Sequence, residues 1–163
     1  MLLNIFINGI DSDTPTSIDR LYGKFDKSFD DYETIKPKFD LTMKVINSIY
    51  EYLNGNIHCF SGKQYFYTLF AALVHQLYGL PVLDAPRKSE YSSEHISEHM
   101  PCLLDRLAQF ENHFERCIID KASWYDMYVE FTEFEKLHRT RTTNKTERFE
   151  RVRFLSNYIA GDL

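Results

Sequence analysis

The segment E-H-I-S-E-H-M-P (94–101) holds the first residues whose spacing suggests chemistry. His95, Glu98 and His99 form the pattern H-x-x-E-H, an inverted zinc-protease motif in which two histidines bind the metal and the glutamate activates water. The pattern works only if one continuous helix brings both histidines to the same face. Pro101 argues against this, because a proline disfavours helical geometry at the residue before it and suits the first turn of a new helix. We therefore expect a solvated loop running into a helix start, with no metal or other cofactor.

Arg106 and His113 form a second pattern, R-x6-H. Its spacing resembles that of helical ribonuclease domains in bacterial toxins, where the arginine and the histidine meet across a dimer. Those domains usually carry a polar residue directly after the arginine, whereas this chain has Leu107. Seven positions put the two side chains on one side of a helix, a placement that any amphipathic helix produces often. A surface arginine with a partly buried histidine is the plainer interpretation, and a dimeric ribonuclease is the alternative function.

Other catalytic signatures are missing from the sequence. Neither G-x-x-x-x-G-K-[ST] nor G-x-G-x-x-G occurs, so no phosphate-binding loop is predicted, and there is no G-x-S-x-G. Cys59 follows His58 directly, but neighbours in sequence are no evidence for a nucleophile and its base. The three cysteines, which include Cys102 and Cys117, form no C-x-x-C pair and are odd in number, so we expect reduced, mostly buried thiols. We assign no catalytic residue.

Basic residues gather near the end of the chain. Residues 136–153 hold seven Lys and Arg against two Glu and carry +5, so that the rest of this −5 chain carries −10. Guanidinium groups beside a helix N-terminus suit phosphate binding, but they can equally pair with the many Asp and Glu residues of the fold. We favour the structural ion pairs and keep nucleic-acid binding as the alternative. Its candidate residues are Arg139, Arg141, Lys145, Arg148 and Arg151.

Hydrophobic periodicity predicts an all-α fold, an irregular multi-helix domain around a buried central helix at about 64–78. This central segment is apolar nearly all round, and Ser61 with Gln64 forms the S-x-x-Q pattern of a capping box in front of it. Thr16 and Asp19 suggest a similar start for a helix ending near Phe25. The remaining expected helices cover about 39–53, 101–118, 121–138 and 145–160.

The composition predicts one soluble domain. A length of 163 residues and a hydrophobic content of 44% suit a single core, although the polar loop 82–100 offers a possible subdomain boundary. The apolar start at Leu2 and Leu3 has no capping residue before it, as if the chain began inside a helix. No apolar run reaches the length of a membrane span and no signal peptide is evident. We expect a cytoplasmic protein without membrane contact, and the oligomeric state stays open.

Two segments resemble a known family. RTRTTNKTERFERVRFL (139–155) and KQYFYTLFAALVHQLYGLP (63–81) are similar to the carboxy-terminal helical region of the bacterial GmrSD-type, ParB-like family. Its characterised members act in restriction and antiphage defence. The likeness covers about residues 1–160, and the arginines that match the basic ending of the family are Arg139, Arg141, Arg148 and Arg151.

The resemblance implies a role without catalysis. In this family the catalytic residues lie in an amino-terminal ParB-like domain, and its D-G-x-x-R stretch does not occur in this chain. The leading hypothesis is therefore a helical interaction module of a restriction or defence protein. Such a module would dock a ParB-like catalytic half, and would contact DNA or RNA if residues 139–153 bind phosphate.

Overall fold

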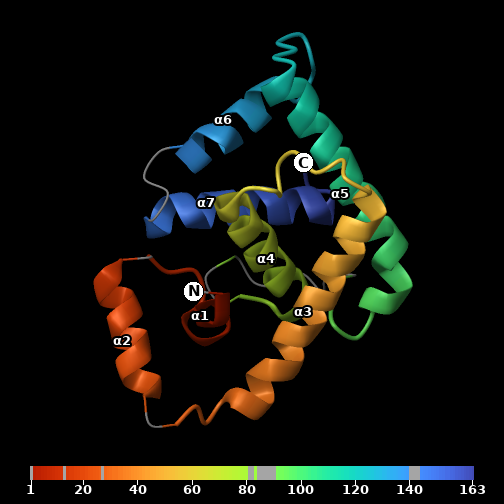
Figure 1. Ribbon diagram of the computed structural model, residues 1–163. Helices are drawn as coiled ribbons and strands as arrows, with labels where there is room; N and C mark the ends of the chain where they lie inside the picture. Colours follow the sequence, from red (N-terminus) through yellow and green to blue (C-terminus); the bar gives the residue numbers. More distant parts are fainter. Residues whose placement is uncertain (1, 13, 27, 81–82, 84–90, 140–143) are drawn as a thin grey trace.

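The computed structural model describes residues 2–12, 14–26, 28–80, 83, 91–139 and 144–163. These residues form seven α-helices and one π-helical turn and contain no strand, which confirms the predicted all-α fold (Figure 1). The elements are α1 (Leu2–Asn8), α2 (Pro15–Phe25), α3 (Tyr32–Leu53), α4 (Lys63–Tyr78), α5 (Ile96–Phe114), η1 (Glu115–Ile119), α6 (Tyr128–Arg139) and α7 (Lys145–Ala160).

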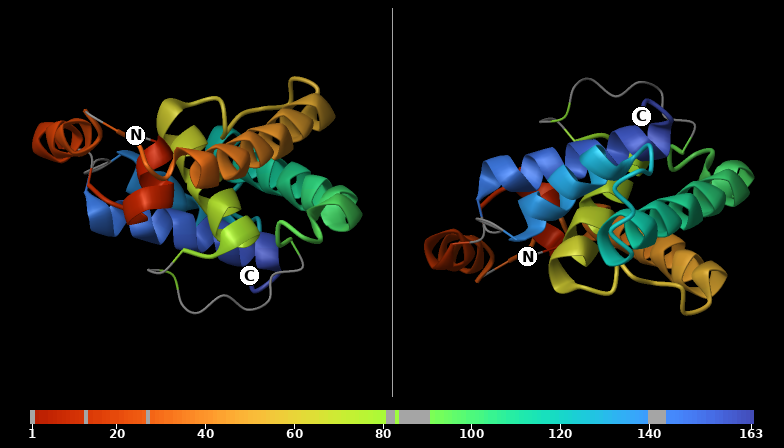
Figure 2. Two further views of the ribbon diagram at one scale, coloured as in Figure 1. Left: turned by 90° about the horizontal axis from the view of Figure 1, so that it is seen from below. Right: turned by 90° about the horizontal axis from the view of Figure 1, so that it is seen from above.

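Helix α4 is the centre of the core, as its sequence predicts. All residues from Tyr67 to Val74 are buried, and Gln76 and Leu77 continue the buried stretch. Since no face of α4 is polar, other helices must cover it from several sides. The helices α1, α3 and α7 pack on it, and α7 makes the most extensive contact (Figures 1 and 2).

An aromatic cluster joins α5, α6 and α7. Its members are Phe110, Phe131, Phe134, Phe154 and Tyr158. The paired rings have centroid distances from 4.8 Å for Phe110 and Phe131 to 6.4 Å for Phe131 and Phe134. Most of the pairs meet edge to face, an arrangement that stabilises aromatic contacts beyond the burial of their surface. The cluster fixes the positions of the last helices against α5.

Two helices begin earlier than their prolines suggest. Helix α3 starts at Tyr32 rather than near Phe39, and α5 starts at Ile96 rather than at Pro101, so these two predicted starts are wrong. In both helices the proline, Pro37 or Pro101, is the sixth residue. A proline there removes a single hydrogen bond close to the helix start, where water can satisfy the freed carbonyl group.

The predicted caps are also corrected. Thr14, not Thr16, caps α2: its Oγ1 accepts from the backbone N–H of Ser17 at 3.2 Å. Gly62 takes the capping position of α4, and no side chain caps this helix. The hydroxyl of Ser61 instead donates to the carbonyl of His58 at 3.1 Å. Gly62 itself has an ordinary extended backbone, with φ −82° and ψ 140°.

The other boundaries agree in part with the sequence. Helix α7 lies where it is expected, and α5 continues through the π-helical turn η1 to Ile119. Helix α6 begins only at Tyr128, because residues 120–127 form turns, with Lys121 at a positive φ of 53°. Of the predicted loop 82–100, residues 82 and 84–90 lie outside the described part, Leu83 lies in a buried bend, residues 91–95 are turns, and residues 96–100 belong to α5. None of the described helices has both the length and the hydropathy that crossing a membrane requires.

Candidate functional site

Two of the predicted nucleic-acid contacts lie inside the protein. Arg148 and Arg151 of α7 are only 5% and 1% exposed. The guanidinium of Arg148 lies 4.4 Å from the ring centroid of Tyr67 and donates through Nη1 to the carbonyl of Asp11 at 3.1 Å. Arg151 donates through Nη1 to the carbonyl of Leu137 at 3.4 Å. These arginines therefore connect α7 to α4, to the segment after α1 and to α6.

Burial lowers the pKa of Arg151 but leaves its guanidinium group charged. Desolvation and the neighbouring charge of Arg148 lower the pKa of Arg151 to about 10, a value that still leaves it protonated at neutral pH.

Of the other candidates, Arg139 is exposed and paired with Glu135, Lys145 is exposed, and Arg141 lies outside the described residues. The structure thus places two of the five candidates in the core and two on the surface.

The H-x-x-E-H pattern lies at the start of α5, so the predicted loop up to Pro101 is wrong. His95 is the residue in front of α5, and Glu98 and His99 lie in its first turns. The ring of His99 packs edge to face on Tyr91 with a centroid distance of 6.4 Å. Within the described part of the chain, no three His, Cys, Asp or Glu residues are placed to hold a metal ion together.

Arg106 and His113 both lie on α5 and face the end of α7. A Cβ built on Gly161 would lie 2.8 Å from the guanidinium nitrogens of Arg106. The ring of His113 has centroid distances of 5.4 Å to Tyr125 and 5.9 Å to Tyr158, and burial lowers its pKa. Arg106 Nε and His113 Nδ1 are buried, and neither forms a hydrogen bond with any described residue. Unsatisfied buried nitrogens are uncommon, so this pair needs an explanation.

His138 on α6 is a buried histidine that the sequence analysis did not single out. Its ring stacks on Tyr65 with a centroid distance of 3.8 Å, Nδ1 lies 2.9 Å from the carbonyl oxygen of Phe134, and Nε2 lies 3.1 Å from Oγ1 of Thr68. A proton on Nδ1 donates to the carbonyl and leaves Nε2 to accept from the threonine. Burial lowers the pKa of His138 to about 3. The histidine is therefore neutral near pH 7 and is a packed, hydrogen-bonded part of the core.

A cavity of about 390 Å³ lies between the end of α3 and the middle of α5. The end of α3 and the chain after it form one wall, and α5 with the first residue of η1 forms the other. The lining residues are Tyr52, Leu53, Asn56, His58, Ala108, Glu111, Asn112 and Glu115. Because the lining combines carboxylates, amides, an imidazole and an aromatic ring, this cavity is the candidate functional site.

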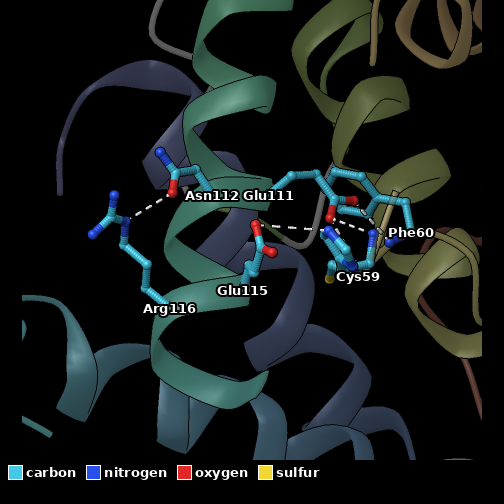
Figure 3. A network of polar contacts seen from close by, with 7 residues as sticks. Cys59, Phe60, Glu111, Asn112, Glu115 and Arg116 are labelled. Carbon is cyan, nitrogen blue, oxygen red and sulfur yellow. Dashed lines mark hydrogen bonds and ion pairs between the residues drawn. The ribbon is translucent and has the colours of Figure 1, made fainter. Parts of the chain in front are cut away.

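Glu111 forms the floor of the cavity and is only 2% exposed. Its Oε2 accepts from the backbone N–H groups of His58 and Cys59, both at 2.8 Å, and its Oε1 accepts from that of Phe60 at 3.0 Å (Figure 3). A carboxylate has room for about four such bonds, and three charge-assisted bonds compensate much of the cost of burial. Glu111 thus fixes the backbone between α3 and α4 against α5.

The rim of the cavity carries more accessible groups. Glu115 places Oε2 at 3.7 Å from Nε2 of His58, and its side chain is 46% exposed. The hydroxyl of Tyr52 donates to Asp105, one turn before Ala108. The opening therefore offers a half-exposed carboxylate and a tyrosine ring whose hydroxyl is held in place.

Cys59 beside the cavity is not a suitable nucleophile. The residue is fully buried, and burial followed by the charge of Glu111 raises its pKa well above the ordinary value. The thiolate is the nucleophilic form, and this setting suppresses it. The cavity therefore suits binding better than covalent chemistry.

Scans against protein-family models, curated proteins and solved structures find no match to the chain. The resemblance to the GmrSD-type family accordingly remains a prediction.

The sequence contains one signal for the missed cavity. Leu103, Leu107, Phe110 and Phe114 mark the buried face of α5, and Glu111 lies four residues after Leu107 and three before Phe114, inside that face. An acidic residue on an apolar helix face requires hydrogen-bond donors from elsewhere in the fold. The identity of those donors, the backbone groups of residues 58–60, follows only from the structure.

Replacing Glu111 should test its role in the fold. We expect Glu111→Gln to lower the free energy of unfolding by about 3 kcal/mol, because the amide NH₂ group cannot accept from the backbone N–H groups that it would face. Urea unfolding monitored by circular dichroism measures the loss. The control Glu115→Gln, four residues further on and half exposed, should change the stability by less than about 0.5 kcal/mol. Equal losses in both variants would contradict this assignment.

His138 should make the stability depend on pH. Its pKa is about 3 in the folded state and about 6.5 when unfolded, so its contribution is present above pH 6.5 and is lost as the pH falls toward 3. From about pH 7 to about pH 4.5, we expect the native protein to lose about 2.5 kcal/mol more than His138→Gln does. The control His95→Gln, at an exposed position, should keep the native pH dependence. Parallel stability profiles for the native protein and His138→Gln would refute the assignment.

Proposed function

We propose that this chain is a non-catalytic helical interaction module of a GmrSD-type restriction or defence protein. Its role would be to dock a ParB-like catalytic half. The family part of the proposal rests on the resemblance of residues 63–81 and 139–155, and the docking part rests on one structural observation. Helix α2 is amphipathic and capped, yet none of its eleven residues is buried.

The apolar residues of α2 form one stripe. Ile18, Leu21, Tyr22 and Phe25 follow the spacing i, i+3, i+4, i+7 that places side chains on one helix face. Ile18 is 36% exposed and Tyr22 is 74% exposed. An isolated helix of this length is only marginally stable in water, so that an uncovered apolar stripe favours a helix that completes its packing in a complex.

Aromatic residues extend this stripe toward α3. Phe29 lies between its neighbours, with ring centroids 4.8 Å from Phe25 and 6.3 Å from Tyr32. Tyr32 is itself 47% exposed. We call the set Ile18, Leu21, Tyr22, Phe25, Phe29 and Tyr32 the α2 face. Exposed tyrosines beside apolar residues are typical of the side chains that dominate protein interfaces.

Fewer residues are available for contact with nucleic acid than the sequence suggests. Arg148 and Arg151 serve the core, so that Arg139 and Lys145 are the exposed candidates among the described residues. They lie at the end of α6 and the start of α7. Docking of a protein partner is therefore the better-supported part of the proposal.

The docking proposal predicts the effect of a charge on the α2 face. Tyr22→Asp should weaken binding to the proposed ParB-like half by about 2 kcal/mol, or about 30-fold, because the carboxylate must lose its water in the interface. Isothermal titration calorimetry measures the affinity. The control Trp124→Asp changes an aromatic residue of similar exposure, 77%, before α6, and should bind like the native chain. Equal affinities of the two variants would refute docking through α2.

A dimeric ribonuclease is the second candidate function. The observation in its favour is that Arg106 Nε and His113 Nδ1 are both buried without a hydrogen-bond partner among the described residues. A neutral histidine can serve as a general base, and the lowered pKa of His113 favours that form.

Incubation of the purified protein with RNA separates the two functions. We expect the RNA to stay intact, because the ring of His113 packs against Tyr125 and Tyr158. Cleavage that His113→Ala abolishes, and that the exposed-site control His95→Ala retains, would replace the docking module by the ribonuclease.

A further inference from the structure

We propose that the cavity between α3 and α5 binds the guanidinium group of an arginine side chain presented by a peptide segment. This inference does not depend on the α2 face or on the family resemblance. Its basis is a cavity of about 390 Å³ with an acidic and aromatic lining, a volume sufficient for one large side chain and some water.

The charge of the lining favours a cation. Glu111 and Glu115 contribute carboxylates, and none of the described residues that line the cavity is Lys or Arg. Arg116, which follows Glu115 in η1, is turned away from Glu111, as Figure 3 shows. It donates through Nε to Asn112 Oδ1 at 2.9 Å, and its guanidinium lies 5.5 Å from the ring centroid of Tyr125. Among the described lining residues, His58 beside Glu115 is the only one that can carry a positive charge, so the two carboxylates make the lining acidic overall.

The two carboxylates have different roles. Glu111 is occupied by three backbone N–H groups and supplies a fixed negative charge at the floor. Glu115 is 46% exposed, and its 3.7 Å separation from Nε2 of His58 is too long for a hydrogen bond. Its oxygens can therefore accept from a ligand without breaking a hydrogen bond to His58. A planar guanidinium group can meet such a carboxylate with two parallel N–H donors.

Tyr52 provides an aromatic wall. The residue is 50% exposed, and its hydroxyl is held by Asp105. A guanidinium group packs well on an aromatic face and is more weakly hydrated than an ammonium group. Leu53 and Ala108 add apolar surface to the lining, suited to the methylene groups of an arginine. Together these features favour arginine over lysine and over a neutral side chain.

Titration of the full chain with blocked amino acids tests the proposal. The probes are N-acetyl-arginine methylamide and its lysine and citrulline counterparts, observed by shifts of backbone amide signals in NMR spectra of the ¹⁵N-labelled protein. We expect the arginine probe to bind with a Kd of about 1 mM and to shift the signals of residues 58–60. Citrulline has nearly the same shape without the charge and should bind at least about tenfold more weakly, and lysine should bind about threefold more weakly.

Two variants assign the contacts. Glu115→Gln should weaken arginine binding about tenfold, and Tyr52→Leu should weaken it about threefold. Both positions are substantially exposed, so both variants should keep the native circular dichroism spectrum. The control Glu33→Gln removes an exposed carboxylate at the start of α3 and should leave the Kd unchanged.

Three results would overturn the proposal. They are no binding of the arginine probe up to about 20 mM, equal affinities for arginine and citrulline, and an unchanged Kd in Glu115→Gln. None of them bears on the α2 face, because these probes require no partner protein. Loss of partner binding in Tyr22→Asp would equally leave the cavity untouched.

Discussion

The fold depends on one constraint: α4 has no polar face and must be covered from several sides. Covering it also buries polar atoms, and these must find partners. Gln76 of α4 donates through Nε2 to the carbonyl of Ser156 on α7 at 3.0 Å, and Oγ1 of Thr68 lies 3.1 Å from His138 on α6. Apolar burial supplies most of the stabilisation. The two polar contacts restrict how α6 and α7 can sit on α4, because a shift of either helix would leave a buried group without its partner.

The same constraint explains why arginines of the basic segment are buried. Positive charge concentrated between residues 136 and 153 indicates a binding surface when the sequence is taken alone. Helix α7 must nevertheless lie against α4, and its long arginines extend across that contact: Arg148 reaches the ring of Tyr67 and the carbonyl of Asp11, and Arg151 reaches the carbonyl of Leu137. Guanidinium groups suit this task because they stay charged and offer several donors in one plane. At Arg148 and Arg151, the clustered positive charge therefore belongs to a contact between helices and is not available for phosphate binding.

Periodicity predicts the helices that bury apolar residues and fails where boundaries depend on exposed backbone. The central helix and α7 follow from their sequences, because residues such as Leu73 and Val152 lie deep in the core. The starts predicted from Pro37 and Pro101 are wrong. Each proline is the sixth residue of its helix, where it removes only one hydrogen bond. The cavity could not be predicted, because it joins His58 to Glu111 across 53 positions, and local patterns carry no information about such a pair. Only the acidic residue on the buried face of α5 hinted at it.

Helix α3 connects the α2 face to the cavity. Its 22 residues extend over about 33 Å, with Tyr32 of the α2 face as the first residue and Tyr52 of the cavity as the last but one. A partner on one surface therefore leaves the other accessible. The residues that line the cavity differ in how freely they can change: Glu111 is required by the fold, whereas Glu115 and Tyr52 are half exposed. Substitutions at the rim can alter what the cavity binds without disturbing the backbone that Glu111 holds. The arrangement thus separates a fixed structural carboxylate from an adjustable recognition surface.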